Sequence, residues 1–229
     1  MSQLRWLRLD YGRADRQIGR GAKPNRLSVF ICVWLAAHGT SCLEAVAVLF
    51  GIVSVYLSTR ENIWSWPTAL VNVSLFTLLF LGSGLYSDTG LQVVYFVLSV
   101  YGWYEWLYGG AGHTAISVTA TTRRTWGVLG GIGVVAWLIL ATVTSHLPGT
   151  KLPYLDAATT TISLLAQWMM TRKLLENWLV WIGVDVVYVG MFIYKGLYLT
   201  AINYGIYLAL AVVGYIAWKK SLAATGSFA

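Results

Sequence analysis

Four residues with the chemistry to hold a ligand recur three or four positions apart in the last third of the chain: Trp178, Trp181, Asp185 and Tyr188. This spacing puts them on one face of a helix. An acid flanked by aromatic rings suits a cationic or hydroxyl-rich ring, because aromatic faces attract cations and carboxylates accept hydrogen bonds from hydroxyls. Aromatic residues at the end of a membrane span also form belts at the interface with water. That alternative stays open for Trp178.

A second polar face carries Asp156, Thr160, Ser163 and Gln167, which are spaced by four, three and four residues. Polar and ionisable groups inside a membrane span are costly, and they usually face a cavity or a partner. Thr160 and Ser163 equally fit hydrogen bonding between helices. We expect Gln167 and Asp156 to take part in the site or to position it; the alternative for Asp156, near the end of the span, is a helix cap.

Further candidates lie on two upstream segments, where amide and aromatic side chains share one side of a helix. They are Asn72 and Phe76 on the first segment, and Gln92, Tyr95 and Trp103 on the second. Together with the two faces described above, they predict a binding site built from several helices.

The sequence holds none of the common catalytic motifs. The three histidines, His38, His113 and His146, lie far apart and lack the spacing of metal ligands. No phosphate-binding loop and no nucleophile elbow occurs in the sequence. We therefore predict that the chain is not an enzyme, holds no metal or cofactor, and does not use ATP.

The candidate residues are set in an apolar chain. Hydrophobic residues make up 57% and charged residues 11% of the 229 positions, whereas soluble domains carry about 25% charged residues. A single soluble domain is excluded, because too little polar surface remains to cover it. The net charge of +7 is explained by the cytoplasmic loops of a membrane protein, which collect Lys and Arg, rather than by nucleic-acid binding.

The predicted fold class is an all-α polytopic membrane protein. A helix needs about 20 apolar residues to cross the hydrocarbon core of the lipid bilayer, and seven stretches meet or nearly meet that length. They run over 42–59, 65–86, 89–108, 126–147, 153–171, 177–195 and 197–218.

Loop charges predict the orientation of these spans. One side of the membrane receives the cationic residues Arg60, Arg123, Arg124, Arg172, Lys173, Lys219 and Lys220, whereas the loops of the other side hold Lys151 and Lys195. The positive side is cytoplasmic, so we expect a multi-pass protein of the inner (plasma) membrane with its tail, 221–229, in the cytoplasm. Residues 1–26 are expected to form a basic, disordered tail, and residues 27–40 an extra short apolar helix.

An internal repeat runs through the chain at an offset of 112 residues. It pairs Trp66 with Trp178, Tyr95 with Tyr207, Gly102 with Gly214, Trp106 with Trp218, and Gly84-Leu85-Tyr86 with Gly196-Leu197-Tyr198. Each copy, 41–110 and 152–220, holds three spans, and the span 125–148 links them. Because one linker span returns the chain to its starting side, the two copies share one orientation. Parallel repeats are typical of transporters whose substrate site lies between the repeats.

The stretches Tyr101–Trp106 and Met170–Trp181 resemble the Pnu family of vitamin transporters, in particular its PnuC-type nicotinamide riboside transporters. The similarity covers roughly residues 43–220 and includes two Trp-x-x-Trp motifs. The resemblance implies a three-plus-one-plus-three helix fold related to the sugar-transporting SWEET proteins, and a homotrimer. It also implies a central site that stacks the substrate on aromatic rings and hydrogen-bonds it with amides, which adds Asn177 to the candidates.

The resemblance further implies facilitated diffusion of a vitamin, which a cytoplasmic kinase then traps by phosphorylation. Nicotinamide riboside, a precursor of NAD, ranks first because the Asn-Trp-x-x-Trp stretch from Asn177 to Trp181 is most similar to that branch. Thiamine, riboflavin and deoxynucleosides stay open as alternatives within the family.

Two readings from other classes also stay open. A membrane-embedded enzyme would need convergent carboxylates with a metal, or a nucleophile with its base. A non-transporting membrane subunit would have no need of Asp185, Gln167 and Gln92 at membrane depth.

Overall fold

The computed structural model describes residues 41–146, 153–194 and 196–226. The predicted tail 1–26 and the predicted short helix 27–40 lie outside these residues. The chain divides into two units, Met1–Val46 and Ala47–Ala229. Of the first unit, the structure describes only the beginning of one helix.

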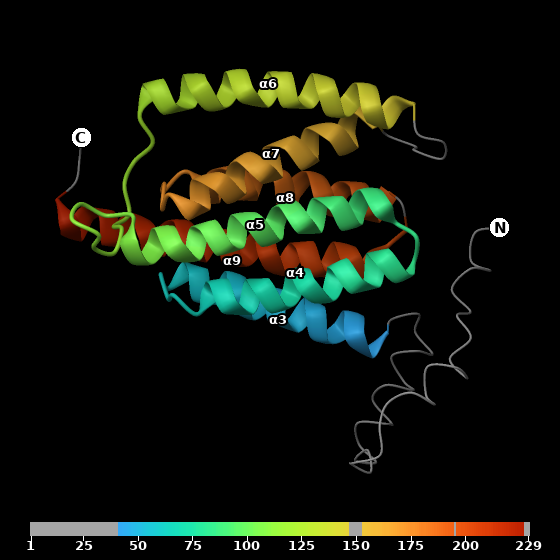
Figure 1. Ribbon diagram of the computed structural model, residues 1–229, viewed down its shortest axis with the longest axis horizontal. Coiled ribbons are helices and arrows are strands. Elements are labelled where there is room, and N and C mark those ends of the chain that lie inside the picture. The colour runs from blue at the N-terminus through green and yellow to red at the C-terminus, as the bar shows by residue number, and fades with distance from the viewer. Residues whose placement is uncertain (1–40, 147–152, 195, 227–229) are drawn as a thin grey trace, which may run out of the picture. The chain divides into compact units, whose positions relative to one another are not determined.

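The described residues form seven helices, as Figure 1 shows. They are α3 (Cys42–Thr59), α4 (Ser65–Gly82), α5 (Tyr86–Tyr108), α6 (Arg123–Ser145), α7 (Pro153–Thr171), α8 (Asn177–Tyr194) and α9 (Tyr198–Thr225). All-helical architecture is therefore confirmed. Each helix corresponds to one of the seven predicted spans.

Two helix ends differ most from the prediction. The second span was expected to run to residue 86, but α4 ends at Gly82 and a short turn follows, in which Gly84 has a φ of 72°. A left-handed backbone is accessible to glycine at little cost. The last helix continues to Thr225, into the predicted tail 221–229, because Lys219, Lys220 and the residues that follow them include good helix formers.

Five of the described helices are long and apolar enough to cross a membrane: α3, α4, α6, α8 and α9. The other two, α5 and α7, carry most of the polar residues that the sequence points to, among them Gln92 and Gln167. These two helices pack against each other. Polar residues within a bundle of spans are tolerated where they face its interior, so the least apolar helices meet where a site would be expected.

Helix bounds recur along the chain at the offset of the sequence repeat. Helices α4 and α8 each have 18 residues and begin at Ser65 and Asn177. The turns that follow them contain Gly84 and Gly196, with φ values of 72° and 74°. Helices α4 and α8 and the turns after them therefore have the same length and backbone conformation, at the offset of the sequence repeat.

Neighbouring helices pack in the pairs α4–α5, α5–α7, α7–α8 and α8–α9, and α6 lies at the edge of the bundle against α7 (Figure 1). The turns α3–α4 and α7–α8, the loop 109–122 and the start of α6 all lie at one end of the bundle. We call this the charged end, because it holds Arg60, Arg123, Arg172 and Lys173.

The core of the charged end is a cluster of four tryptophans, Trp66, Trp106, Trp178 and Trp218, all at most 3% exposed. Trp66 meets Trp106 edge to face with ring centroids 5.3 Å apart, and Trp178 meets Trp218 in the same way at 5.4 Å. Edge-to-face pairs contribute about 0.5–1.5 kcal/mol beyond the area that they bury.

Two hydrogen bonds tie this tryptophan cluster across the repeat. The Trp106 indole N–H donates to the Met170 carbonyl at 3.1 Å, and the Trp218 indole N–H donates to the Ser58 carbonyl at 3.0 Å. The two donors are repeat partners, and so are the two acceptors. Each three-helix segment therefore donates one buried hydrogen bond to the other.

Glycines make room for the tryptophan cluster. A Cβ atom added at Gly102 would overlap the Trp66 ring, and one added at Gly214 would overlap the Trp178 ring. Each ring therefore packs directly on the backbone of the third helix in its own copy of the repeat.

We predict that Gly102→Ala destabilises the protein, because the added methyl group forces the Trp66 ring to move. Overpacking a core costs about 1–3 kcal/mol, which should lower the thermal unfolding midpoint by several degrees. Gly90→Ala is the matched control on the same helix, since a Cβ there meets nothing within 4 Å. Equal midpoints for the two variants would show that the Trp66 contact is not tight.

Candidate functional site

A buried carboxylate and a group of aromatic rings lie together between α8 and α9. Asp185 of α8 is 3% exposed. On the next turn of α8, Tyr188 lies with its ring centroid 4.6 Å from that of Tyr204, and Phe192 stacks on Tyr204 at 5.2 Å. Tyr207 meets Tyr204 edge to face at 6.0 Å. We call Tyr95, Tyr188, Phe192, Tyr204 and Tyr207 the tyrosine cluster.

Helices of both repeats contribute to this region. The phenol of Tyr95 on α5 lies close to Ser163 on α7 and within electrostatic range of Tyr188. On the other side, the Tyr207 hydroxyl and the Asn72 amide crowd the space next to Gly51 on α3, and Asn72 Nδ2 donates to the Ala47 carbonyl at 2.7 Å.

This arrangement follows the repeat. Tyr95 and Tyr207 are repeat partners, and the positions that they approach, 163 and 51, are separated by the same offset. One tyrosine of each repeat therefore lies against the first helix of the other repeat. The result is a polar and aromatic region at the interface of the two three-helix segments.

The structure brings together four of the residues predicted for the site: Asp185, Tyr188, Tyr95 and Asn72. The rings stack, the phenols offer both donors and acceptors, and the Asp185 carboxylate lies within electrostatic range of Tyr204 and Tyr207. Such a set can bind a flat ring with hydroxyl substituents, and it favours a ring that carries positive charge.

The structure places two other predicted residues closer to the charged end. Trp178 is 1% exposed and belongs to the tryptophan cluster. Asn177 is fully buried at the start of α8, where its Nδ2 donates to the Leu174 carbonyl at 2.6 Å. Among the described residues, neither Asn177 Oδ1 nor Trp178 Nε1 has a hydrogen-bond partner, which leaves two buried polar atoms available to another molecule.

The remaining predicted residues lie in several places. Trp181 is partly buried and packs against the tryptophan cluster. Phe76 stacks on Phe80 at 5.6 Å. Gln92 and Gln167 are half-buried, and Trp103 is 38% exposed.

Sequence reasoning missed Phe192, Tyr204 and Tyr207. A signal for one of them was available, because Tyr207 is the repeat partner of the predicted Tyr95. Tyr204 lies one turn before Tyr207, and Phe192 lies one turn after Tyr188. Helical spacing from Tyr207 and Tyr188 therefore also points to these two residues.

Charged residues lie next to the tryptophan cluster. Lys173 Nζ lies 2.9 Å from a Glu61 carboxylate oxygen, and it also sits 4.6 Å from the Trp106 ring centroid. Glu61 and Lys173 are repeat partners in equivalent turns, and both have left-handed backbones with φ values of 52° and 48°. This ion pair therefore joins the two repeats at corresponding points.

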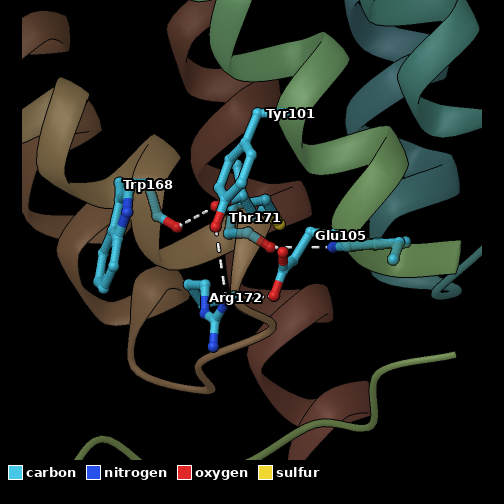
Figure 2. Close-up of polar contacts among 7 residues, drawn as sticks. Tyr101, Glu105, Trp168, Thr171 and Arg172 are labelled. Carbon is cyan, nitrogen blue, oxygen red and sulfur yellow. Dashed lines mark hydrogen bonds and ion pairs between the residues drawn. The ribbon is translucent and has the colours of Figure 1, made fainter. Parts of the chain in front are cut away.

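A second ion pair joins Glu105 to Arg172, the residue before Lys173, and Figure 2 shows both of its side chains. Tyr101 also accepts a hydrogen bond from Arg172, at 3.5 Å. Burial lowers the pKa of the Arg172 guanidinium, but Tyr101 and the Glu105 carboxylate raise it by more, so that the net pKa lies above its ordinary value. Arg172 thus stays charged, and it holds α5 against the α7–α8 turn.

The loop between α5 and α6 completes the charged end. Thr119 N–H donates to the Lys173 carbonyl at 3.1 Å, and Leu175 N–H donates back to the Thr119 carbonyl at 2.9 Å. The Glu176 carboxylate accepts from Thr121 N–H at 2.8 Å. The loop is thereby fixed across the α7–α8 turn.

In the part of the chain that the structure describes, no three His, Cys, Asp or Glu residues come together in a group that could hold a metal ion.

Comparison with known proteins identifies the family. The description "nicotinamide mononucleotide transporter" applies to a family that matches residues 41–220. The chain belongs to this family. It therefore belongs to a family of membrane transporters, and the resemblance noted in the sequence is confirmed.

Individual relatives agree with this assignment. The chain is 28% identical to the nicotinamide riboside transporter PnuC of Escherichia coli, over 87% of this chain and 94% of the relative. It is 26% identical to the riboflavin/roseoflavin transporter RibM of Streptomyces davaonensis, over 76% of this chain and 83% of the relative. A crystal structure of the vitamin B3 transporter PnuC is similar with a TM-score of 0.66 and 26% identity, over 94% of this chain and 99% of that one.

We predict that Glu61 and Lys173 are coupled in stability. Glu61→Gln and Lys173→Met should each lower the thermal unfolding midpoint, because each leaves its partner's charge partly buried without a counter-ion. The double variant should be less destabilised than the sum of the two, with a coupling of about 0.5–3 kcal/mol. The exposure of Glu61, 24% of its side chain, favours the lower half of that range.

Arg60→Met supplies the control for this cycle, because Arg60 is an exposed cation that directly precedes Glu61 and interacts with the Tyr56 ring at 5.8 Å instead. Its effect should be small and should add to that of Glu61→Gln. Strict additivity of Glu61→Gln and Lys173→Met would contradict the coupling.

Proposed function

We propose that this chain carries nicotinamide riboside across the membrane by facilitated diffusion, as a step in NAD precursor uptake. The observation that carries the proposal is the buried Asp185 beside the tyrosine cluster, in a chain similar to transporters named for nicotinamide riboside. The pyridinium ring of this substrate is flat and positively charged, so that it gains from stacking and from a nearby carboxylate. Its ribose hydroxyls suit the phenols and amides of the same region.

The proposed architecture is a three-plus-one-plus-three arrangement of spans, with α6 as the linker between parallel repeats, like that of SWEET proteins. Support comes from the constant offset of the helix bounds and from the reciprocal tryptophan hydrogen bonds. In this arrangement α5 and α7 also cross the membrane, and their polar faces are sheltered by the surrounding helices.

The proposed mode of action is passive. The sequence carries no nucleotide-binding motif, so net uptake would follow the substrate gradient until a cytoplasmic kinase traps the vitamin by phosphorylation. We place the protein in the inner membrane as a homotrimer, with the charged end and the C-terminus in the cytoplasm. The cationic residues gathered at one end support this orientation.

Riboflavin transport is the second candidate, because the similarity to RibM extends over most of both chains. The isoalloxazine ring of riboflavin is neutral and therefore gains little from Asp185. Asp185→Asn should weaken the binding of nicotinamide riboside more than that of riboflavin. Thiamine and deoxynucleosides remain further alternatives within the family.

We predict that proteoliposomes containing only this protein take up radiolabelled nicotinamide riboside until the internal and external concentrations are equal. Encapsulating a nicotinamide riboside kinase with ATP should then raise the total internal label above that level. Riboflavin and thiamine, tested as competitors, should inhibit less than unlabelled nicotinamide riboside. Accumulation of unmodified substrate under a proton or sodium gradient would contradict passive transport, and absence of uptake would contradict the function itself.

We predict that Trp181→Ala weakens the binding of nicotinamide riboside at least tenfold. Stacking on an aromatic wall is worth about 1–3 kcal/mol per ring in nucleic-base systems, a desolvated cation adds about 0.5–2 kcal/mol, and about 1.4 kcal/mol corresponds to one decade. Trp181→Phe should retain part of the affinity, because a smaller ring remains. Titration calorimetry on the purified proteins measures this, and equal dissociation constants for all three would remove Trp181 from the site.

A further inference from the structure

An apolar groove runs between α6 and α7, away from the tyrosine cluster. Its volume is about 510 Å³, and Figure 1 shows these two helices at the edge of the bundle. Its lining includes Trp126, Gly130, Gly133 and Trp137 of α6 and Ile162 and Leu165 of α7. No part of the transport chemistry described above uses this groove.

Small residues of α6 create the groove. A Cβ atom added at Gly130 would meet nothing within 4 Å, so that open space lies directly over the backbone. At Gly133, by contrast, an added Cβ would come within 2.9 Å of Leu165, so that α6 and α7 touch there. The groove is thus a gap between two helices that touch at Gly133 and are also joined by a hydrogen bond from Trp137 Nε1 to the Tyr154 carbonyl at 3.2 Å.

The length of the groove matches one leaflet of a bilayer. On α6 it extends from Trp126 to Trp137, which at about 1.5 Å per residue is about 16 Å. The hydrocarbon core is about 30 Å thick, so the groove spans about half of it. One fatty acyl chain, which reaches from the headgroup to the midplane, has this extent.

The end of the groove nearest to the start of α6 is positively charged. Arg123 and Arg124 are the first two residues of α6 and are exposed, one helical turn from Trp126. The two ion pairs found among the described residues lie elsewhere, between Glu105 and Arg172 and between Glu61 and Lys173. The N-terminus of the helix adds its own positive field, which attracts phosphate groups.

We propose that the groove binds an anionic phospholipid, with one acyl chain between α6 and α7 and the phosphate on Arg123 and Arg124. Basic pockets between membrane helices bind anionic lipid headgroups, and guanidinium groups pair well with phosphate. A second copy of the chain would also cover an apolar groove. The arginine pair at the mouth and the length of one leaflet favour the lipid.

The test measures phospholipid bound to the purified full-length protein by native mass spectrometry, with phosphatidylglycerol and phosphatidylcholine of the same acyl chains added in turn. Wild type should bind phosphatidylglycerol with at least about fivefold preference over phosphatidylcholine. Gly130→Leu places a side chain in the groove at a position where an added Cβ meets nothing within 4 Å, and it should reduce binding of both lipids at least about fivefold. The double variant Arg123→Gln with Arg124→Gln should remove the preference and leave residual binding of both.

Two matched control variants test whether the effects are specific to the groove and to the arginine pair. Gly127→Leu adds the same side chain to α6 at a position with open space that does not line the groove. Lys219→Gln with Lys220→Gln removes two cations from the end of α9. Both controls should bind phosphatidylglycerol like wild type.

Several results would overturn the proposal. These are equal retention of the two lipids by wild type, and equal lipid binding by wild type and Gly130→Leu. A change of oligomeric state in Gly130→Leu at unchanged lipid binding would assign the groove to a second copy of the chain and reject the lipid. If Gly130→Leu does not fold, the arginine variant decides alone, and retention of its preference for phosphatidylglycerol rejects the site.

Discussion

The fold depends on two buried hydrogen bonds that cross between its three-helix segments. Trp106 donates to the Met170 carbonyl and Trp218 to the Ser58 carbonyl, in a water-poor core where a lost partner costs about 1–3 kcal/mol. Because both acceptors lie near the ends of α3 and α7, the bonds fix the helix that starts each segment against the helix that ends the other. The ion pair between Glu61 and Lys173 likewise joins the two segments, at the charged end.

The polar region at the interface of the segments depends on these contacts between the two segments. Once α5 is held against α7 and α9 against α3, Tyr95 reaches Ser163 and Tyr207 reaches the space beside Gly51 and Asn72. Asp185 and Tyr188 of α8 complete this polar region. The repeat is not exact here, since position 163 is serine and position 51 is glycine. An asymmetric ligand such as a nucleoside needs such a difference, because its ring and its sugar require different neighbours.

Much of this arrangement was predictable from sequence, and the reasons for the remainder are physical. The seven helices and the repeat follow from hydropathy and spacing, because a membrane span has a fixed length and duplicated segments keep their turns. Helical spacing put Trp178 on the same face as Asp185, but two turns separate them, so they meet different neighbours. The contact of the 109–122 loop with the α7–α8 turn could not be predicted, because the bonds of Thr119 join backbone groups and no spacing in the sequence marks Thr121 as the partner of Glu176.

We propose that the substrate binds between the two segments, among α5, α7, α8 and α9. A crystal structure of the protein with nicotinamide riboside would show where it binds. We expect density for the pyridinium ring stacked on an aromatic ring of α8 or α9, with the ring nitrogen facing Asp185 and the ribose near the amides and phenols. Density for the substrate in the α6–α7 groove, or outside the bundle, with the tyrosine cluster unchanged, would contradict it.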